Sequence, residues 1–296
     1  MRIFITGASG YLGYHIAAQC INEGHQVLCL KRSTSKSLFS EEQEKQISWV
    51  TKDNQGWENQ VKTFAPEVLI HAAWGGVRGV GREDADIQKQ NILMSNQLYT
   101  LYPYKQIIAL GSQAEYGYYE GPVSEEHILN PQMLYAKAKV ASMHELQLYC
   151  DSKGIEWQWI RVFTVFGEKQ TGGLIQLAIN NCKNGVEQFD TTEGYQVYSY
   201  LYSKDFAKSI CQVIGSKGKS GVYNISQPKE ELSNRETLET IKQMMSSKIQ
   251  YNYGAVPYAK DQVMLMTGTV DKFEKAFGPI PFTDFRVALQ NTINSL

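Results

Sequence analysis

Tyr135 and Lys139 are the residues whose types and spacing most directly suggest chemistry. They are four positions apart in residues 133–152, a segment that favours a helix, so both side chains should lie on one helical face. A phenol has a pKa of about 10, and an ammonium group beside it would stabilise the phenolate and lower that pKa. The pair could then act as a general acid or base. The same spacing also occurs where the lysine is exposed and the tyrosine is half-buried, so the interpretation depends on the rest of the chain.

A glycine-rich turn near the N-terminus predicts a dinucleotide site. Gly7, Gly10 and Gly13 lie between a predicted strand, residues 1–6, and a predicted helix, residues 15–22. The glycines would permit a tight turn, close approach of a pyrophosphate and close packing of helix on strand, and the helix N-terminus would attract phosphate. The alternative is a plain glycine-rich turn. The expected cofactor contacts here are Gly7, Ser9, Gly10, Tyr11, Leu12 and Gly13.

The end of the second predicted strand, residues 26–30, bears on the choice of cofactor. NAD enzymes usually place an acidic residue there to bind the ribose hydroxyl. Here Lys31 and Arg32 follow instead, and they would attract a 2′-phosphate. The sequence therefore favours NADP(H) over NAD(H), unless this is only a solvated basic loop. Asp53, after a third strand at residues 47–50, could contact the adenine or could be an exposed turn residue.

Two later strands should also end at the cofactor and substrate site. The fourth, residues 67–71, runs into Ala72 and Ala73, whose small side chains would let a cofactor lie against the backbone. The fifth, residues 105–110, ends just before Ser112. Because ligands of parallel sheets bind beyond the carboxyl ends of the strands, Ser112 is placed to bind a substrate carbonyl. It could instead cap a helix.

Composition excludes several classes of protein. The 296 residues carry a net charge of −1, which gives no basic surplus for nucleic acid or anionic membranes. The longest apolar runs are too short to cross a bilayer, and the N-terminus lacks the shape of a signal peptide. The five cysteines are scattered, without a Cys-x-x-Cys pair, which argues against a structural metal site or a disulfide framework. We therefore expect a cytoplasmic protein without a bound metal.

Taken in order, these motifs resemble those of the extended short-chain dehydrogenase/reductases, and more narrowly the NAD(P)-dependent nucleotide-sugar epimerase/dehydratase family. The resemblance covers nearly the whole chain. Beside Tyr135 and Lys139, it rests on residues 6–13 (Thr-Gly-Ala-x-Gly-x-x-Gly), 112–117 (near Ser-Ser-x-x-Val-Tyr-Gly), 161–167 (near Arg-x-Phe-Asn-Val-Tyr-Gly), 200–205 and 221–225.

Departures from the family pattern narrow the expected reaction. Dehydratases of the family have an Asp-Glu pair where this chain has Gln113 and Ala114, which cannot act as acid or base, so dehydration is not expected. Thr164 replaces an asparagine near the substrate diphosphate, and Tyr198 replaces an arginine. The resemblance implies substrate contacts from Ser112, Gln113 and Thr164. It is strongest to reductases of nucleotide-linked 4-keto-6-deoxy sugars, such as the CDP-abequose and CDP-paratose synthases.

The resemblance also implies an architecture. We expect an α/β fold, a Rossmann-type doubly wound parallel sheet in residues 1–166, and a smaller α/β substrate region in residues 167–296. Residues 204–213 should pack back on the first domain. Members of the family often dimerise through the helices that correspond to residues 84–101 and 133–152, so a homodimer is expected.

The expected activity is reduction of a nucleotide-linked ketosugar by NADPH. Tyr135 would donate the proton, Lys139 would hold the cofactor ribose and keep the Tyr135 pKa low, and Ser112 would stabilise the carbonyl oxygen. The main alternative is a 4-epimerase with tightly bound NAD, which would use the same three residues. The sequence is also compatible with a reductase of an unrelated small ketone, or with a non-enzymatic cofactor-binding protein.

Overall fold

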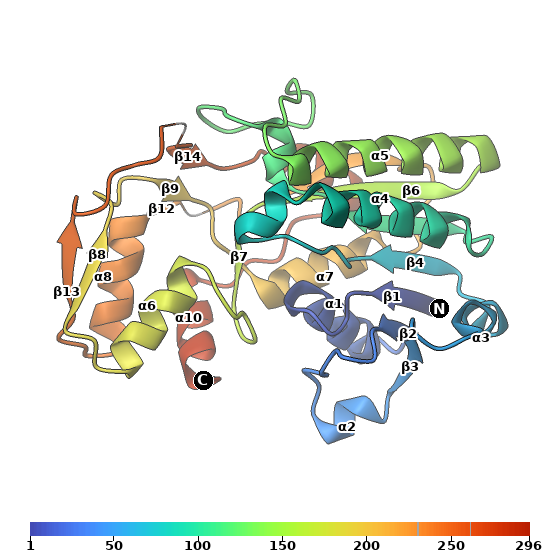
Figure 1. The fold of residues 1–296 in the computed structure, drawn as a ribbon, viewed down its shortest axis with the longest axis horizontal. Coiled ribbons are helices and arrows are strands. Elements are labelled where there is room, and N and C mark those ends of the chain that lie inside the picture. Colours follow the sequence, from blue (N-terminus) through green and yellow to red (C-terminus); the bar gives the residue numbers. More distant parts are fainter. Residues whose placement is uncertain (230, 261) are drawn as a thin grey trace.

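The computed structural model describes residues 1–229, 231–260 and 262–296, and its main feature is a seven-stranded sheet in which every pairing is parallel (Figure 1). The strand order is β11-β6-β5-β4-β1-β2-β3. The strands are β1 (Arg2–Thr6), β2 (Gln26–Lys31), β3 (Ile47–Thr51), β4 (Val68–His71), β5 (Gln106–Leu110), β6 (Glu156–Val162) and β11 (Gly221–Ile225).

Helices cover both faces of this sheet, and the alternation of side chains along each strand explains why. In β1, Ile3 and Ile5 belong to one apolar core and Phe4 to the other, because successive side chains point to opposite faces. The first core is closed by α1 (Tyr11–Asn22), α7 (Ser203–Val213) and α9 (Asp271–Phe277), and the second by α3 (Trp57–Phe64), α4 (Ala85–Thr100) and α5 (Leu134–Lys153).

The order of the strands fixes where a ligand can bind. From β1 the chain moves outward through β2 and β3, and it then returns to the other side of β1 with β4. This reversal opens a crevice beyond the carboxyl ends of β1 and β4, the position at which doubly wound sheets bind dinucleotides. The predicted fold class is confirmed.

Most of the residues that follow β6 in the sequence form a second region, drawn on the left of Figure 1. Its apolar core contains side chains from α6, α8 and α10, among them Ile179, Leu238 and Leu289. Its elements are β7 (Val165–Phe166), α6 (Leu174–Lys183), β8 (Gln188–Thr191), β9 (Val197–Tyr198), β10 (Leu201–Tyr202), β12 (Leu232–Ser233), α8 (Asn234–Met244), β13 (Gln250–Tyr253), β14 (Leu265–Met266) and α10 (Phe285–Asn294).

Two late segments return to the main sheet. Helix α7 contributes Phe206, Ile210 and Val213 to the core that also contains side chains of α1. Strand β11 pairs with β6 and adds a seventh strand that periodicity alone does not indicate. In the part of the chain that the structure describes, no helix is both long and apolar enough to cross a membrane.

Candidate active site

The glycine turn between β1 and α1 is packed as tightly as its sequence predicts. Gly7 has φ +81°, and a Cβ there would lie 2.7 Å from the backbone nitrogen of Ala73. A Cβ on Gly13 would lie 2.2 Å from the carbonyl oxygen of Gly7. Both positions therefore require glycine, one for its backbone conformation and both for space. The structure brings the predicted loops at Gly7 and at Ala72 and Ala73 into contact.

Helix α1 has Gly10 as its N-cap, and its first backbone N–H groups are free within the part of the chain that the structure describes. Gly10 has an extended conformation, and no side chain among the described residues caps this helix end. The N–H groups of the first turn, which includes Tyr11, Leu12 and Gly13, therefore remain available to an anion, and the helix dipole adds positive potential. Ser9 lies in the same turn. These residues fit the pyrophosphate of a dinucleotide.

A buried chain of hydrogen bonds fixes the end of β4 beside this turn. Ser95 donates its only hydroxyl proton to the Asn91 carbonyl oxygen, so its Oγ accepts a proton from His71 Nε2 at 2.9 Å. His71 Nδ1 then accepts from Thr6 Oγ1 at 2.7 Å, and Thr6 Oγ1 accepts from Ala73 N. Burial, with Lys139 nearby, lowers the pKa of His71 to about 3, so this histidine is neutral and structural.

The residues expected to choose the cofactor lie at the ends of β2 and β3. The ammonium of Lys31 sits over the Trp49 ring, 4.8 Å from its centroid, whereas Arg32 is exposed. Asp53 is also exposed, and its carboxylate accepts a hydrogen bond from the backbone N–H of Ser33 at 2.6 Å. That bond is the main reason why the pKa of Asp53 is lowered. A carboxylate therefore lies at the end of β2 after all, although it comes from the loop after β3.

Tyr135 and Ser112 come together at the carboxyl end of β5. Ser112 caps a short 3₁₀ helix, η2 (Gln113–Tyr116), by accepting a hydrogen bond from Ala114 N. Tyr135, in the first turn of α5, is only 8% exposed and packs against Ala114. Burial raises the pKa of the Tyr135 phenol, and the Ser112 side chain and then Arg82 offset part of this rise. Ser112 thus serves both as the helix cap and as a neighbour of Tyr135.

Lys139 is buried, and its ammonium group is held by a backbone carbonyl oxygen and an aromatic ring. Its Nζ donates a hydrogen bond to the Leu110 carbonyl oxygen at 2.6 Å and lies 3.7 Å from the centroid of the Trp74 ring. Burial lowers the pKa of Lys139 to about 7, and the Glu115 carboxylate opposes this effect.

The prediction that Lys139 keeps the Tyr135 pKa low is therefore wrong for this structure. The Tyr135 pKa is raised because burial dominates, and Lys139 is not among the groups that lower it. The cation that faces the phenol ring is Arg82, whose Cζ lies 4.9 Å from the ring centroid.

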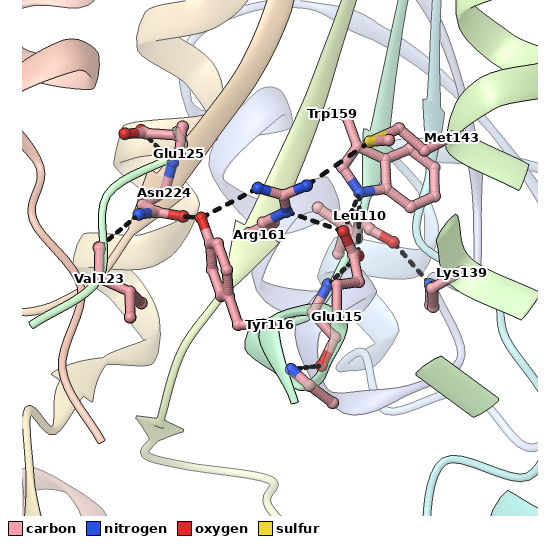
Figure 2. A network of polar contacts seen from close by, with 12 residues as sticks. Leu110, Glu115, Tyr116, Val123, Glu125, Lys139, Met143, Trp159, Arg161 and Asn224 are labelled. Carbon is pink, nitrogen blue, oxygen red and sulfur yellow. Dashed lines mark hydrogen bonds and ion pairs between the residues drawn. The ribbon is translucent and has the colours of Figure 1, made fainter. Parts of the chain in front are cut away.

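Glu115 is the centre of a buried polar network (Figure 2). Its carboxylate accepts hydrogen bonds from the backbone N–H of Ser112 at 2.7 Å, from Trp159 Nε1 at 3.0 Å and from Arg161 Nε at 2.8 Å. Both charged side chains are almost fully buried. The carboxylate thereby ties the loop that carries Ser112 to strand β6, and it is also the negative charge nearest to Lys139 that influences its pKa.

The same network continues toward β11, as Figure 2 shows. Arg161 Nη1 donates to the Tyr116 hydroxyl at 3.0 Å, and that hydroxyl donates to Asn224 Oδ1 at 2.7 Å. Asn224 in turn donates to the Val123 carbonyl oxygen from its side chain and to Glu125 from its backbone. The segment after Ser112 is therefore held by two strands of the sheet.

A cavity of about 280 Å³ lies next to Tyr135, on the side of the second region. Gln113, which is predicted to contact the substrate, is one of the residues that line it. Thr164 does not line it, but its hydroxyl is 3.8 Å from the sulfur of Met266, which does. The lining residues are Arg82, Gln113, Ala114, Gly117, Tyr118, Gln132, Met133, Gln262, Val263 and Met266.

Sequence reasoning missed several residues of this site. Trp74 and Arg82 lie in a loop that carries no pattern beyond its glycines, so nothing in the sequence pointed to them. Glu115 left a signal, since it is a charged residue where the family motif has valine, and Arg161 stands first in a later motif. A buried charged side chain is costly unless it pairs with an opposite charge, and these two residues form such an ion pair.

Within the described residues, no group of three or more histidine, cysteine, aspartate or glutamate side chains is positioned to hold an ion.

The fold and this site define an enzyme of the short-chain dehydrogenase/reductase class, with a Rossmann-type cofactor domain. The profile of the NAD dependent epimerase/dehydratase family matches residues 3–226. The chain belongs to this family, and the resemblance inferred from the order of its motifs is confirmed. It is thus a nucleotide-sugar enzyme of the epimerase/dehydratase type, which confirms the predicted family.

Two characterised relatives match nearly the whole chain at low identity. The dTDP-6-deoxy-L-talose 4-dehydrogenase (NAD(+)) of Aggregatibacter actinomycetemcomitans is 24% identical over 286 residues, which cover 90% of this chain and 99% of the relative. The CDP-abequose synthase of Salmonella muenchen is 24% identical over 277 residues, which cover 89% of this chain and 87% of the relative.

Solved structures share the fold. A UDP-glucose 4-epimerase of Thermotoga maritima with UDP-glucose has a TM-score of 0.88 at 19% identity and covers 100% of this chain and 98% of its own. A UDP-glucuronic acid 4-epimerase of Bacillus cereus, in complex with UDP-glucuronic acid and NAD, has a TM-score of 0.85 at 18% identity, with the same coverage.

Proposed function

We propose that this protein is an NADPH-dependent reductase of a nucleotide-linked 4-keto-6-deoxy sugar. The observation that carries the proposal is the pairing of Ser112 with a buried Tyr135. Because burial raises the Tyr135 pKa, the phenol is protonated near neutral pH. A protonated phenol suits a reduction, in which the enzyme must supply a proton to the product oxygen.

The bound cofactor would supply a hydride to C4 of the ketosugar. Tyr135 donates its proton to the carbonyl oxygen as that oxygen becomes an alkoxide, and Ser112 hydrogen-bonds the same oxygen. Lys139, whose ammonium lies over the Trp74 ring, would bind the cofactor ribose. The residues expected to hold the rest of the cofactor are those of the glycine turn, Ala72, Ala73, Lys31, Arg32 and Asp53.

The site argues against dehydration of the sugar. Gln113 and Ala114 occupy the positions from which dehydratases of the family would use an acidic pair. An amide and a methyl group can neither abstract nor deliver a proton at neutral pH. The cavity beside them therefore suits a substrate whose C5 and C6 chemistry is already complete. The two relatives named for 4-dehydrogenase and abequose synthase activity also concern deoxysugars.

The preference for NADP(H) rests on charge. Arg32 is exposed at the end of β2, where it could bind a 2′-phosphate bidentately. Asp53 acts in the opposite sense, because its carboxylate lies at the Ser33 backbone and would repel a phosphate close to it. This feature favours the second candidate, a 4-epimerase with tightly bound NAD.

Purification and one assay separate the two candidates. The protein is incubated with NADPH or NADH and with CDP-, dTDP- and UDP-linked 4-keto-6-deoxy sugars, and the nicotinamide absorbance is followed. A reductase consumes reduced cofactor in proportion to ketosugar, and its purified form is free of nucleotide. An epimerase retains NAD through purification and interconverts its substrate without added reductant.

The catalytic assignment is tested with Tyr135→Phe. Loss of a general acid should lower turnover by about 100-fold or more. Tyr149→Phe is the matched control, because Tyr149 lies in the same helix α5 at its far end. Near-normal turnover of the Tyr135→Phe protein would refute the role.

We also propose a homodimer formed through α4 and α5. These helices pack against each other on one face of the sheet, and each carries an exposed leucine, Leu93 at 54% and Leu148 at 75%. A Leu148→Glu variant should sediment as a monomer, while the wild-type chain sediments as a dimer. Identical sedimentation of the two proteins at the monomer mass would contradict the proposal.

A further inference from the structure

Arg82 is held beside Tyr135 by contacts on both sides. It lies in the 3₁₀ helix η1 (Gly79–Glu83), in which the Gly81 carbonyl oxygen accepts a hydrogen bond from the Gln88 side chain of α4 at 2.8 Å. On the other side, the Glu83 carboxylate accepts from the backbone N–H of Leu134, the residue before Tyr135. The loop is therefore attached to the same helical turn that carries the phenol.

The guanidinium of Arg82 faces the phenol ring, and at least one of its hydrogen-bond donors is unpaired within the described part of the chain. Its Cζ lies 4.9 Å from the Tyr135 ring centroid, and the side chain lines the cavity. Its Nε is buried without a hydrogen-bond partner among the described residues, and none of the ion pairs found among those residues includes Arg82. The neighbouring carboxylate, Glu83, is already engaged by Leu134. A buried donor without a hydrogen-bond partner costs free energy, so such a group usually has a role, here binding a ligand or stabilising a transient charge.

The charged groups around Tyr135 come from three elements. They are Arg82 and Glu83 of η1, Glu115 of η2 and Lys139 of α5 itself. Lys139 donates to Leu110, and Glu115 is paired with Arg161. Arg82 is therefore the cation placed to respond when charge appears on the phenol oxygen.

We propose that Arg82 is a positioning residue of the reaction, whose guanidinium stabilises the negative charge left on Tyr135 as the phenol gives its proton to the substrate. The proposal deepens the proposed function and rests on it for the identity of the proton acceptor. Arginine suits this task, because its charge persists at every working pH and it stacks on aromatic rings. When Tyr135 transfers its proton, the O–H bond breaks, and its electron pair stays on the phenolate facing Arg82.

The first test does not depend on turnover. A ring-fluorinated tyrosine is placed at position 135, and its single fluorine signal is titrated by NMR. An opposite charge within this distance typically shifts a pKa by about one unit or more, so Arg82→Gln should raise the titration midpoint by about that amount. Arg82→Lys should raise it less. Arg78→Gln is the matched control, because Arg78 is in the loop that leads into η1 but its guanidinium contacts Thr171.

The second test uses the pH profile of ketosugar reduction. The activity of the wild-type enzyme should fall at alkaline pH as Tyr135 loses its proton. In Arg82→Gln this fall should move to higher pH by about one unit, and kcat below it should drop by about 10-fold, with partial recovery in Arg82→Lys.

The outcomes separate the two proposals. An unchanged fluorine midpoint in Arg82→Gln overturns the role of Arg82, whatever the enzyme reduces. A raised midpoint supports it even if no ketosugar is turned over, a result that would refute the proposed function alone. If ketosugar is reduced but activity falls at the same alkaline pH in Arg82→Gln as in the wild-type enzyme, that result also refutes the role of Arg82.

Discussion

Breaking the ion pair between Glu115 and Arg161 should cost several kcal/mol of stability, and Glu115→Gln tests this. The side chains are 0% and 3% exposed, and 2.8 Å separates Glu115 Oε2 from Arg161 Nε. Burial is the largest single influence on Arg161 and would lower its pKa, but the Glu115 carboxylate and the Tyr116 hydroxyl together outweigh burial, so the pKa is raised. The glutamine keeps the shape but removes the charge, and its amide N–H group would face donors of Arg161 or Trp159.

The expected loss follows from the burial. Removing one partner of a buried pair costs about 3–5 kcal/mol, because the remaining charge is left without compensation. At about 2–4 °C per kcal/mol for a domain of this order of size, the unfolding midpoint should fall by about 6–20 °C. The orientation of Ser112 should suffer as well, since the same carboxylate accepts its backbone N–H.

Urea unfolding followed by circular dichroism measures the effect, with m-values compared to check that the unfolding transition itself is unchanged. Glu193→Gln is the matched control, because Glu193 pairs with Arg235 at a surface where both side chains are well exposed, and it should cost about 1 kcal/mol or less. The double variant Glu115→Gln with Arg161→Met should be less destabilised than the sum of the two single changes. A loss below about 1 kcal/mol in Glu115→Gln, or strict additivity in the double variant, would refute the reasoning.

Three further predictions concern the cofactor site. Gly13→Ala should abolish tight cofactor binding in calorimetry, because the added Cβ would lie 2.2 Å from the Gly7 carbonyl oxygen. Burial lowers the Lys139 pKa to about 7 from an ordinary value of 10.5, so between these pH values the unfolded chain binds more protons than the folded protein. The free energy of unfolding should therefore rise with pH across this window, by up to about 1.4 kcal/mol per unit, in the wild-type protein and in the exposed-site control Lys137→Met but not in Lys139→Met. Arg32→Glu should shift the ratio of kcat/KM values toward NADH by about 10-fold or more, and an unchanged ratio would show that Arg32 does not contact the 2′-phosphate.

Much of the cofactor domain could be predicted from local sequence. Short apolar runs bounded by turn residues indicated the first five parallel strands, β1 to β5, and the glycine spacing indicated the turn that the structure builds at Gly7 and Gly13. The last strand, β11, could not be recognised in this way. Its place in the sheet depends on pairing with β6, which precedes it by about sixty residues, and no local pattern encodes a pairing of that separation.

The roles of individual charges were also beyond the sequence. The Tyr135/Lys139 spacing suggests a lysine that acidifies a phenol, which requires the ammonium to point at the oxygen. In the fold, the Leu110 carbonyl oxygen and the Trp74 ring lie closer to that ammonium, and burial raises the phenol pKa instead. Such outcomes depend on desolvation, which is a property of the packed surroundings.

The sequence by itself determined the family, the glycine turn and the candidate trio of Ser112, Tyr135 and Lys139, because residue type and short spacing limit what a backbone segment can do. Only the tertiary structure decided that Arg82 faces the phenol and that Glu115 pairs with Arg161. These contacts join segments 46 and 53 residues apart in the chain. The energies of such contacts depend on distance and burial, which are defined only when the whole chain has packed.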